Sequence, residues 1–226
     1  MSAPKPASIA RSASALLAIA LLGCEPFGVS LGSEELCIAD SRLADPDLSH
    51  AGEAPSNCAV IGDSVLVNAG FEAPEVGTCE AGAFCQFPAA EVPAWQTSSS
   101  ARLIEIWHGG HRDVPAPEGA QFVELDAIST DTLWQDVQLE PGSLMYWSLL
   151  HRGRNGIENF ELLIGPPEAP VSQVEITSAS DDWYAYSGLY RAGLGESTTR
   201  LSLASRFGTT EGNLLDAIYF GPVVER

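Results

Sequence analysis

The sequence predicts an all-β protein: an antiparallel jelly-roll β-sandwich that follows a disordered N-terminal tether. From residue 60 onward, short runs of Val, Ile, Leu and aromatic residues alternate with clusters of Gly, Pro, Asn and Asp, as in chains of short strands and turns. Several of these runs place an apolar residue at every second position, which is the period of a strand. No window of a dozen residues carries a helical apolar stripe. This pattern favours a sandwich over an α/β fold.

Ten segments have this strand-like character. We expect strands at 64–68, 102–107, 121–127, 132–139, 144–152, 157–164, 171–177, 183–191, 199–206 and 214–220. In the third of these, Val123, Leu125 and Ala127 share one face, and the residues between them share the other. In the segment 144–152, alternation places His151 on the face of Trp147 and Arg152 on the opposite face.

The first residues read as an export signal. Lys5 and Arg11 are the only charged residues before Cys24, and an apolar run follows at 13–22. That run is too short to cross a bilayer as a helix, which needs about 20 apolar residues, but it suits the apolar region of a secretory signal. The run ends in Leu-Leu-Gly-Cys, which resembles the lipobox of bacterial lipoprotein precursors. We therefore favour lipidation at Cys24 over an ordinary signal with a free cysteine nearby.

This interpretation sets the expected organisation of the chain. Residues 1–23 form the lipoprotein signal peptide, 24–59 a lipid-anchored tether and 60–226 the β-sandwich. Two acyl signals hold a protein stably on a membrane, so the expected partner is the membrane itself, through the lipid anchor. Glu25 is not the Asp that often retains lipoproteins on the inner membrane, and we expect the outer membrane or the cell surface.

The chain is strongly acidic, with 11 Lys and Arg against 30 Asp and Glu and a formal net charge of −19. Removal of residues 1–23 leaves 203 residues, nine of them basic, and a net charge near −21. Such a surface repels phosphate backbones, so nucleic acid is excluded as a partner.

Four cysteines remain besides Cys24. An even number in an exported chain predicts disulfides. Proximity in sequence favours Cys37–Cys58 and Cys79–Cys85 among the three possible pairings. No Cys-x-x-Cys motif is present, so neither a zinc ribbon nor a redox site is indicated.

The stretch from Asn68 to the C-terminus resembles the galactose-binding-like β-sandwich domains of bacterial surface proteins and plant cell-wall proteins. Seven pieces occur in the order typical of these domains: Asn-Ala-Gly-Phe-Glu at 68–72, Val-Pro-Ala-Trp at 92–95, Ile-Glu-Ile-Trp at 104–107, Gly-Ala-Gln-Phe-Val-Glu-Leu-Asp-Ala at 119–127, Leu-Trp-Gln-Asp at 133–136, Trp-Ser-Leu-Leu-His-Arg-Gly-Arg at 147–154 and Asn-Leu-Leu-Asp at 213–216. The resemblance implies a module that binds carbohydrate or cell wall.

The resemblance also implies a structural calcium ion. In similar sandwiches an early Glu and a late Asp hold Ca²⁺ together with main-chain carbonyls, and the matching residues here are Glu72 and Asp216. Ca²⁺ takes six to eight oxygen ligands, so carboxylates at these places are chemically suitable. The alternative is that both carboxylates cap strand ends or pair with arginine.

A cationic cluster stands out in this acidic chain at His151, Arg152 and Arg154. Planar guanidinium groups suit carboxylates, including those of uronic acids. We slightly favour a structural role, in which the arginines pair with Glu124 or Glu158 of neighbouring strands.

Other candidate ligand-binding residues are aromatic or acidic. Trp183 and Tyr184 follow a polar loop and are the best candidates for an exposed stacking surface, although most tryptophans in a sandwich belong to the core. The remaining candidate ligand-binding residues are Glu105, Trp107 and Glu124. A pair of carboxylates could also cleave glycosides, provided that they lie roughly 5–10 Å apart.

Three functions therefore remain open. The first is a non-catalytic, surface-anchored lipoprotein that binds a polysaccharide or cell-wall glycan, with an acidic glycan expected at the cationic cluster. The second is a structural or protein-interaction lipoprotein that uses the sandwich as a scaffold. A glycoside-active enzyme is the third and the least favoured, since no nucleophile–base pair is evident.

Overall fold

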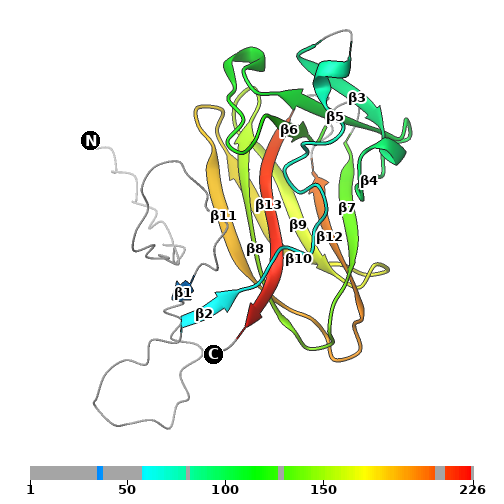
Figure 1. The fold of residues 1–226 in the computed structure, drawn as a ribbon, viewed down its shortest axis with the longest axis vertical. Helices are drawn as coiled ribbons and strands as arrows, with labels where there is room; N and C mark the ends of the chain where they lie inside the picture. The colour runs from blue at the N-terminus through cyan, green and yellow to red at the C-terminus, as the bar shows by residue number, and fades with distance from the viewer. Residues whose placement is uncertain (1–34, 38–57, 80–81, 127–129, 207–211, 225–226) are drawn as a thin grey trace, which may run out of the picture.

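The computed structural model describes residues 35–37, 58–79, 82–126, 130–206 and 212–224. Two antiparallel sheets pack face to face in a β-sandwich (Figure 1), so the predicted fold class is confirmed. In the described part of the chain, no helix has both the length and the hydropathy to cross a bilayer. The expected signal peptide and Cys24 lie outside the described residues.

The larger sheet has eight strands and is organised around the last of them. Its order is β1-β2-β13-β6-β5-β3, and β8 pairs with both β13 and β11. The strands are β1 (Glu35–Cys37), β2 (Cys58–Ile61), β3 (Phe84–Pro88), β5 (Leu103–His108), β6 (Gln121–Glu124), β8 (Leu144–Gly153), β11 (Tyr184–Arg191) and β13 (Asn213–Val224). Strand β13, red in Figure 1, runs along the sandwich and pairs with β2, β6 and β8.

The smaller sheet has five strands in the order β10-β9-β12-β7-β4. They are β4 (Gln96–Thr97), β7 (Thr132–Gln138), β9 (Glu158–Gly165), β10 (Val171–Ser178) and β12 (Thr198–Ser205). Three short 3-10 turns, η1 (Val76–Thr78), η2 (Ala89–Glu91) and η3 (His111–Asp113), lie in the connections.

Nine of the ten expected strands are present, with ends shifted by a few residues, but the expected strand at 64–68 is wrong. Its alternation is real, since Leu66 is buried. Val65 N donates to Phe220 O on β13 at 2.8 Å, but the ladder does not continue, because the main chain at Val67 is held by a side chain. The Gln135 amide accepts a hydrogen bond from Val67 N (3.1 Å) and donates one to Val67 O (2.7 Å). Asn68 then takes a left-handed conformation, with φ 53°. Strands β3 and β4 were not anticipated.

The expected tether contains two described strands. β2 begins at Cys58, two residues before the predicted start of the sandwich, and pairs with β13 through Val60 and Ile61. β1 pairs with β2, so that Cys37 lies opposite Cys58 in the backbone register. The bond between these two cysteines stays a prediction. The predicted Cys79–Cys85 disulfide is present, with Cα atoms 6.0 Å apart.

Strand β8 shows how the core is built. Burial alternates along its ten residues without exception, because successive side chains of a strand point to opposite faces. Met145, Trp147 and Leu149 enter the core between the sheets. Gly188 on β11 faces Trp147, where a Cβ would lie 2.6 Å from the indole ring. The absence of a side chain at 188 therefore makes room for the largest core residue of β8.

Candidate functional site

The outer face of the eight-stranded sheet brings together six of the eight candidate ligand-binding residues. Glu105 on β5 lies directly opposite Glu124 on β6, although 18 residues separate them in the sequence. The alternation that sends Ile104, Ile106 and Val123 into the core turns the two carboxyl groups outward. The outer-face group consists of Glu105, Trp107, Glu124, Arg152, Arg154 and Trp183.

Hydrogen bonds fix both carboxyl groups. Glu105 accepts from the indole of Trp107 (2.6 Å) and from the amide of Gln86 (2.7 Å). Glu124 Oε1 accepts from Arg154 Nη1 at 2.7 Å and from the main-chain nitrogen of Gly212 at 3.3 Å. The Arg154–Glu124 ion pair confirms the structural role that we favoured for Arg154.

The carboxyl group of Glu124 keeps its proton to a higher pH than an ordinary glutamate does. Burial raises the pKa of Glu124 to about 7; the hydrogen bond to Glu105 adds to this rise, and Arg154 opposes it. Glu124 Oε2 is buried and accepts no hydrogen bond in the described structure, so the protonated carboxyl group of Glu124 can use this oxygen to donate to Glu105. Direct contact leaves no space for a glycosidic bond between them, which requires roughly 5–10 Å. This pair therefore lacks the geometry of a glycosidase.

A loop covers this pair and its aromatic neighbours. The guanidinium of Arg154 lies 4.9 Å from the centre of the Trp107 ring, and His111 meets the same ring edge-on at 4.4 Å. Trp183 packs edge-on against Phe122 and donates a 3.0 Å hydrogen bond to the carbonyl of Pro115. Glu105, Trp107 and Glu124 are consequently no more than 5% exposed. They form a packed polar and aromatic cluster beneath the loop at 109–120, where we expected an open binding surface.

His151 does not belong to this face, and its assignment to the cationic cluster is wrong. It is fully buried between the sheets. Its Nδ1 lies 2.8 Å from Ser178 Oγ and its Nε2 lies 2.9 Å from Asn213 Oδ1. Burial lowers the pKa of His151 to about 4, so the ring is neutral at pH 7. It joins β8, β10 and β13 across the sandwich and cannot reach a ligand on the outer face.

The remaining cationic groups also have protein partners. Arg152 donates to the main-chain oxygen of Asp181 at 3.4 Å, and the carboxylate of Asp181 accepts from the hydroxyl of Tyr184 at 2.7 Å. Tyr184 is opposite His151 in the register and is 37% exposed at the edge of the sheet. An acidic glycan would therefore find Arg152 beside acidic residues and Arg154 bound to Glu124.

The outward side chains of β8 form a more open surface, which the sequence-based site residues missed. Leu144, Tyr146, Ser148 and Leu150 are only half-buried. The ring of Tyr146 lies 6.0 Å from that of Tyr219 on β13. We call the outward side chains of Tyr146, Ser148, Leu150 and Tyr219 the tyrosine face. The alternation that placed His151 inward also places Tyr146 outward, so the signal was present in the sequence.

The residues expected to hold calcium meet at one corner of the sandwich, beside Glu118. Asp216 is fully buried and accepts from the main-chain nitrogens of Ala217 (2.7 Å) and Glu118 (3.1 Å). Glu72 accepts from the main-chain nitrogens of Ala120 (2.9 Å) and Gln121 (3.0 Å). Gly119 allows this approach, since a Cβ there would overlap the Glu72 carboxylate.

Charge at this corner suits a cation. Burial raises the pKa of Asp216 to about 8, and the negative charges of Glu118 and Glu72 add to the rise against the two main-chain hydrogen bonds. Within the described ranges no ion pair reaches these three carboxylates. In the same ranges, no three Asp, Glu, His or Cys side chains are grouped to bind a metal alone. A calcium ion here would need main-chain carbonyl oxygens, as the resemblance implied.

We expect Ca²⁺ to raise the melting temperature of the wild type at pH 8. An ion at 100 times its dissociation constant stabilises by about 2.7 kcal/mol, or roughly 5–10 °C for a domain of this size. Asp216→Asn should abolish the shift, and Asp182→Asn, a change at an exposed carboxylate, should preserve it. Scanning calorimetry with calcium and with chelator provides the measurement. An equal shift in Asp216→Asn, or no shift in the wild type, would contradict a site at this corner.

Without calcium, the raised pKa of Asp216 should make the stability of the protein depend on pH. A carboxyl group whose folded pKa exceeds its unfolded value contributes stability at low pH, and that contribution is lost between about pH 4 and pH 8. Asp216→Asn should remove this part of the pH dependence in the presence of chelator.

No protein-family model matches the chain, and no curated protein matches it. Several solved structures are similar to this chain. The Stig cyclase FisC from Fischerella sp. TAU, in complex with (3Z)-3-(1-methyl-2-pyrrolidinylidene)-3H-indole, has a TM-score of 0.51 at 14% identity and covers 73% of this chain and 99% of its own. A cyclase from the same organism, in complex with 4-(1H-indol-3-yl)butan-2-one, has a TM-score of 0.50 at 16% identity, with 73% and 100% covered.

Carbohydrate-binding modules are also among the similar structures. TmCBM61, solved with β-1,4-galactotriose, has a TM-score of 0.43 at 18% identity and covers 70% of this chain and 98% of its own. At these identities the comparisons concern the fold alone. The domain has the predicted antiparallel β-sandwich fold, and its ligand must be argued from its own residues.

Proposed function

We propose that this protein is a non-catalytic, surface-anchored lipoprotein that binds carbohydrate on the tyrosine face. The observation that carries the proposal is the pair of half-buried rings, Tyr146 and Tyr219, on the outward side of a sheet. Both tyrosines offer an apolar ring for the C–H face of a sugar, and Tyr146 also offers a hydroxyl for hydrogen bonding. The hydroxyl of Tyr219 donates to the carbonyl oxygen of Gly62. Ser148, which lies directly opposite Tyr219 in the β8–β13 register, adds a second hydroxyl.

The glycan bound on this face is neutral in our proposal, which revises the acidic glycan expected from the sequence. Arg154 is bound to Glu124, and Arg152 lies beside Asp181. The net charge of −19 repels polyanions over the rest of the surface. A neutral polysaccharide meets no such repulsion and uses the hydroxyls and rings.

An enzyme remains the alternative, because proteins of similar fold include cyclases. Glu124, with a pKa near 7, has the property of a general acid at neutral pH. A general acid must reach its substrate, however, and Glu124 is 1% exposed beneath the loop at 109–120. Because the loop at 109–120 separates Glu124 from solvent, a substrate would not reach this carboxyl group, which favours a non-catalytic function.

Binding to polysaccharides tests the proposal. The soluble domain should bind at least one neutral polymer in a panel of neutral, pectin-like and peptidoglycan polymers and release no product from it. Tyr146→Ala should weaken binding by about tenfold, which corresponds to 1.4 kcal/mol. Tyr184→Ala, which alters a tyrosine away from this face, should leave affinity within about twofold. If the folded domain binds no polymer, the scaffold function becomes the better one.

The anchor has a separate test. Cys24 should carry lipid and residues 1–23 should be absent from the mature protein, because a basic start, a short apolar run and Gly-Cys occur in that order. Intact mass of the membrane fraction checks both points. A Cys24→Ser protein that is still held by the membrane would rule out this anchor.

A further inference from the structure

The β11–β12 loop holds a leucine in solvent. Leu194 is 89% exposed, the highest exposed fraction among the large hydrophobic side chains of the described residues, and a glycine stands on each side of it in the sequence. Leu194 is not among the residues that line the hollow between this loop and the β9–β10 loop. Burial of a leucine side chain is favourable, and the described part of the fold does not use this contribution.

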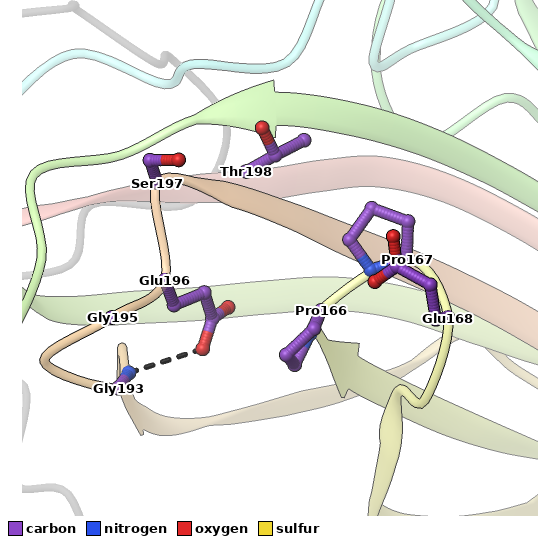
Figure 2. Close-up of a pocket in the computed structure, with 8 residues that line it drawn as sticks. All are labelled: Pro166, Pro167, Glu168, Gly193, Gly195, Glu196, Ser197 and Thr198. Carbon is purple, nitrogen blue, oxygen red and sulfur yellow. Dashed lines mark hydrogen bonds between the residues drawn. The ribbon is translucent and has the colours of Figure 1, made fainter.

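The loop that carries Leu194 is held in one conformation by a buried carboxylate. Glu196 is 8% exposed, and its two oxygens accept hydrogen bonds from Tyr190 Oη (2.7 Å each), Thr199 Oγ1 and Gly193 N (3.0 Å). Figure 2 shows this carboxylate turned back onto Gly193. The main-chain nitrogen of Glu196 also donates to Gly193 O at 3.0 Å. Glu196 therefore serves the turn and has no acceptor position left for a ligand.

The β7–β8 turn supports the loop from the side. Gly142 N donates to Gly193 O at 3.3 Å, and Ala192 N donates to Ser143 O at 2.9 Å. A Cβ at Gly142 would lie 3.1 Å from Leu194 Cδ2, so the glycine at 142 lets the leucine lie against this turn. A side chain on such a rigid loop loses little conformational entropy when it binds.

This loop lies at the end of the sandwich where the N-terminal part of the chain enters (Figure 1). β11 ends opposite Leu144, the first residue of β8. The next residue of β8, Met145, lies opposite Pro222 on β13. The two residues of β13 that follow pair with β2, and β2 pairs with β1. Leu194 and the first described strands thus share one end of the domain.

The expected lipid anchor is close to this end in the sequence. Ten residues separate Cys24 from Glu35, the first residue of β1, and they span at most about 40 Å when fully extended. β8 has ten residues and is about 33 Å long, so the opposite end of the sandwich lies farther from the anchor by roughly that length. A membrane that holds Cys24 is therefore within reach of Leu194.

Charge selects the kind of membrane. Glu140 and Glu168 are exposed on the neighbouring loops at this end, and the whole chain has a net charge of −19. Anionic headgroups would be repelled by this surface. A zwitterionic headgroup region carries no net charge and admits the leucine side chain without this repulsion.

We propose that Leu194 inserts into the zwitterionic bilayer that holds the lipid anchor, so that this end of the sandwich rests on the membrane. The inference rests on the proposed function, because it takes the protein to be anchored at Cys24. β8 then runs away from the membrane, and the tyrosine face stays open to the side for a polysaccharide.

Tryptophan fluorescence of the lipidated full chain in phosphatidylcholine vesicles tests the inference. Leu194→Trp and Ile157→Trp each add one tryptophan to the five of the wild type. Ile157 is 76% exposed and lies at the opposite end of the sandwich, immediately before β9. Tryptophan favours the membrane interface at either position, so only the placement of the domain distinguishes the two variants.

Bromine atoms on the lipid acyl chains quench a tryptophan that enters the bilayer. Relative to the wild type, the tryptophan at 194 should lose more than half of its fluorescence in brominated vesicles, and the tryptophan at 157 should lose almost none. Its emission should also shift to shorter wavelength when vesicles are added.

Two results would overturn the inference and leave the anchor standing, provided that intact mass shows lipid on Cys24. The first is equal quenching of the two variants, or none at 194. The second is a blue shift at 194 that grows with protein concentration in the absence of vesicles, because a second copy of the chain would then cover Leu194. A mature chain without lipid on Cys24 would instead contradict the proposed anchor, and the inference with it.

Discussion

Replacing Arg154 by methionine should destabilise the protein by about 3–5 kcal/mol at pH 8 and by clearly less at pH 5. The variant removes one partner of a buried ion pair and leaves the other. Arg154 is only 12% exposed in its side chain, and the side chain of Glu124 is fully buried. Methionine keeps most of the packing over Trp107, so the change isolates the charge.

The pH dependence follows from the proton on Glu124. Its folded pKa, about 7, lies above the ordinary value of 4.5, so its contribution to stability is complete below about pH 4.5 and is lost as pH rises through 7. At pH 5 the carboxyl group is protonated and needs no cation. Loss of Arg154 moves the folded pKa higher still, and the cost of the variant therefore grows with pH.

Urea unfolding followed by tryptophan fluorescence at pH 5 and pH 8 measures this effect. Glu124→Gln removes the negative charge of the pair. The double variant Arg154→Met/Glu124→Gln should therefore show little of the pH-dependent loss of stability. The difference between single and double variants gives the coupling energy of the pair. Equal destabilisation of Arg154→Met at both pH values would contradict the raised pKa of Glu124.

A second large effect is expected at His151. His151→Ala should cost about 3–5 kcal/mol. It opens a cavity beside Phe160, leaves Asn213 Oδ1 without its partner and removes one of the two hydrogen bonds of Ser178, whose hydroxyl keeps Tyr186. His151→Phe fills the space and should still cost about 2 kcal/mol for the two buried polar groups. If His151→Phe is as stable as the wild type, the hydrogen bonds across the sheets contribute nothing.

His151 should also make the stability of the wild type depend on pH under acidic conditions. Its folded pKa, about 4, lies below the ordinary 6.5, so the unfolded chain gains a proton first as pH falls. Wild-type stability attributable to His151 is then lost between about pH 6.5 and pH 4, by at most roughly 1.4 kcal/mol per pH unit. His151→Phe lacks this dependence, and the difference between the two proteins in urea unfolding from pH 7 to pH 4 measures it.

Local alternation carried most of the correct predictions. The period of two in residues 144–152 predicts His151 inside and Arg152 outside, as the structure has them, so these two side chains cannot face one ligand. It also marked Tyr146 as outward. These inferences succeeded because the direction of a strand side chain depends only on its position in the strand.

Contacts between distant segments could not be predicted in this way. The pairing of Glu105 with Glu124 depends on the register of β5 against β6, and register is set by turns and by the shared core rather than by either residue. The strand expected at 64–68 is interrupted because the main chain of Val67 bonds to the side chain of Gln135, nearly 70 residues away, instead of continuing along β13.

The pairing of β2 with β13 has a mechanical consequence. Chain that enters the domain before Cys58 reaches β2, and β2 is bonded to the last residues of β13. β13 in turn contacts β6 and β8. If the chain is held at Cys24 and a bound polymer is pulled away, the tension enters at the most extensively paired strand of the sheet. The pulling force is therefore distributed over several paired strands and does not detach an edge strand such as β3 or β11.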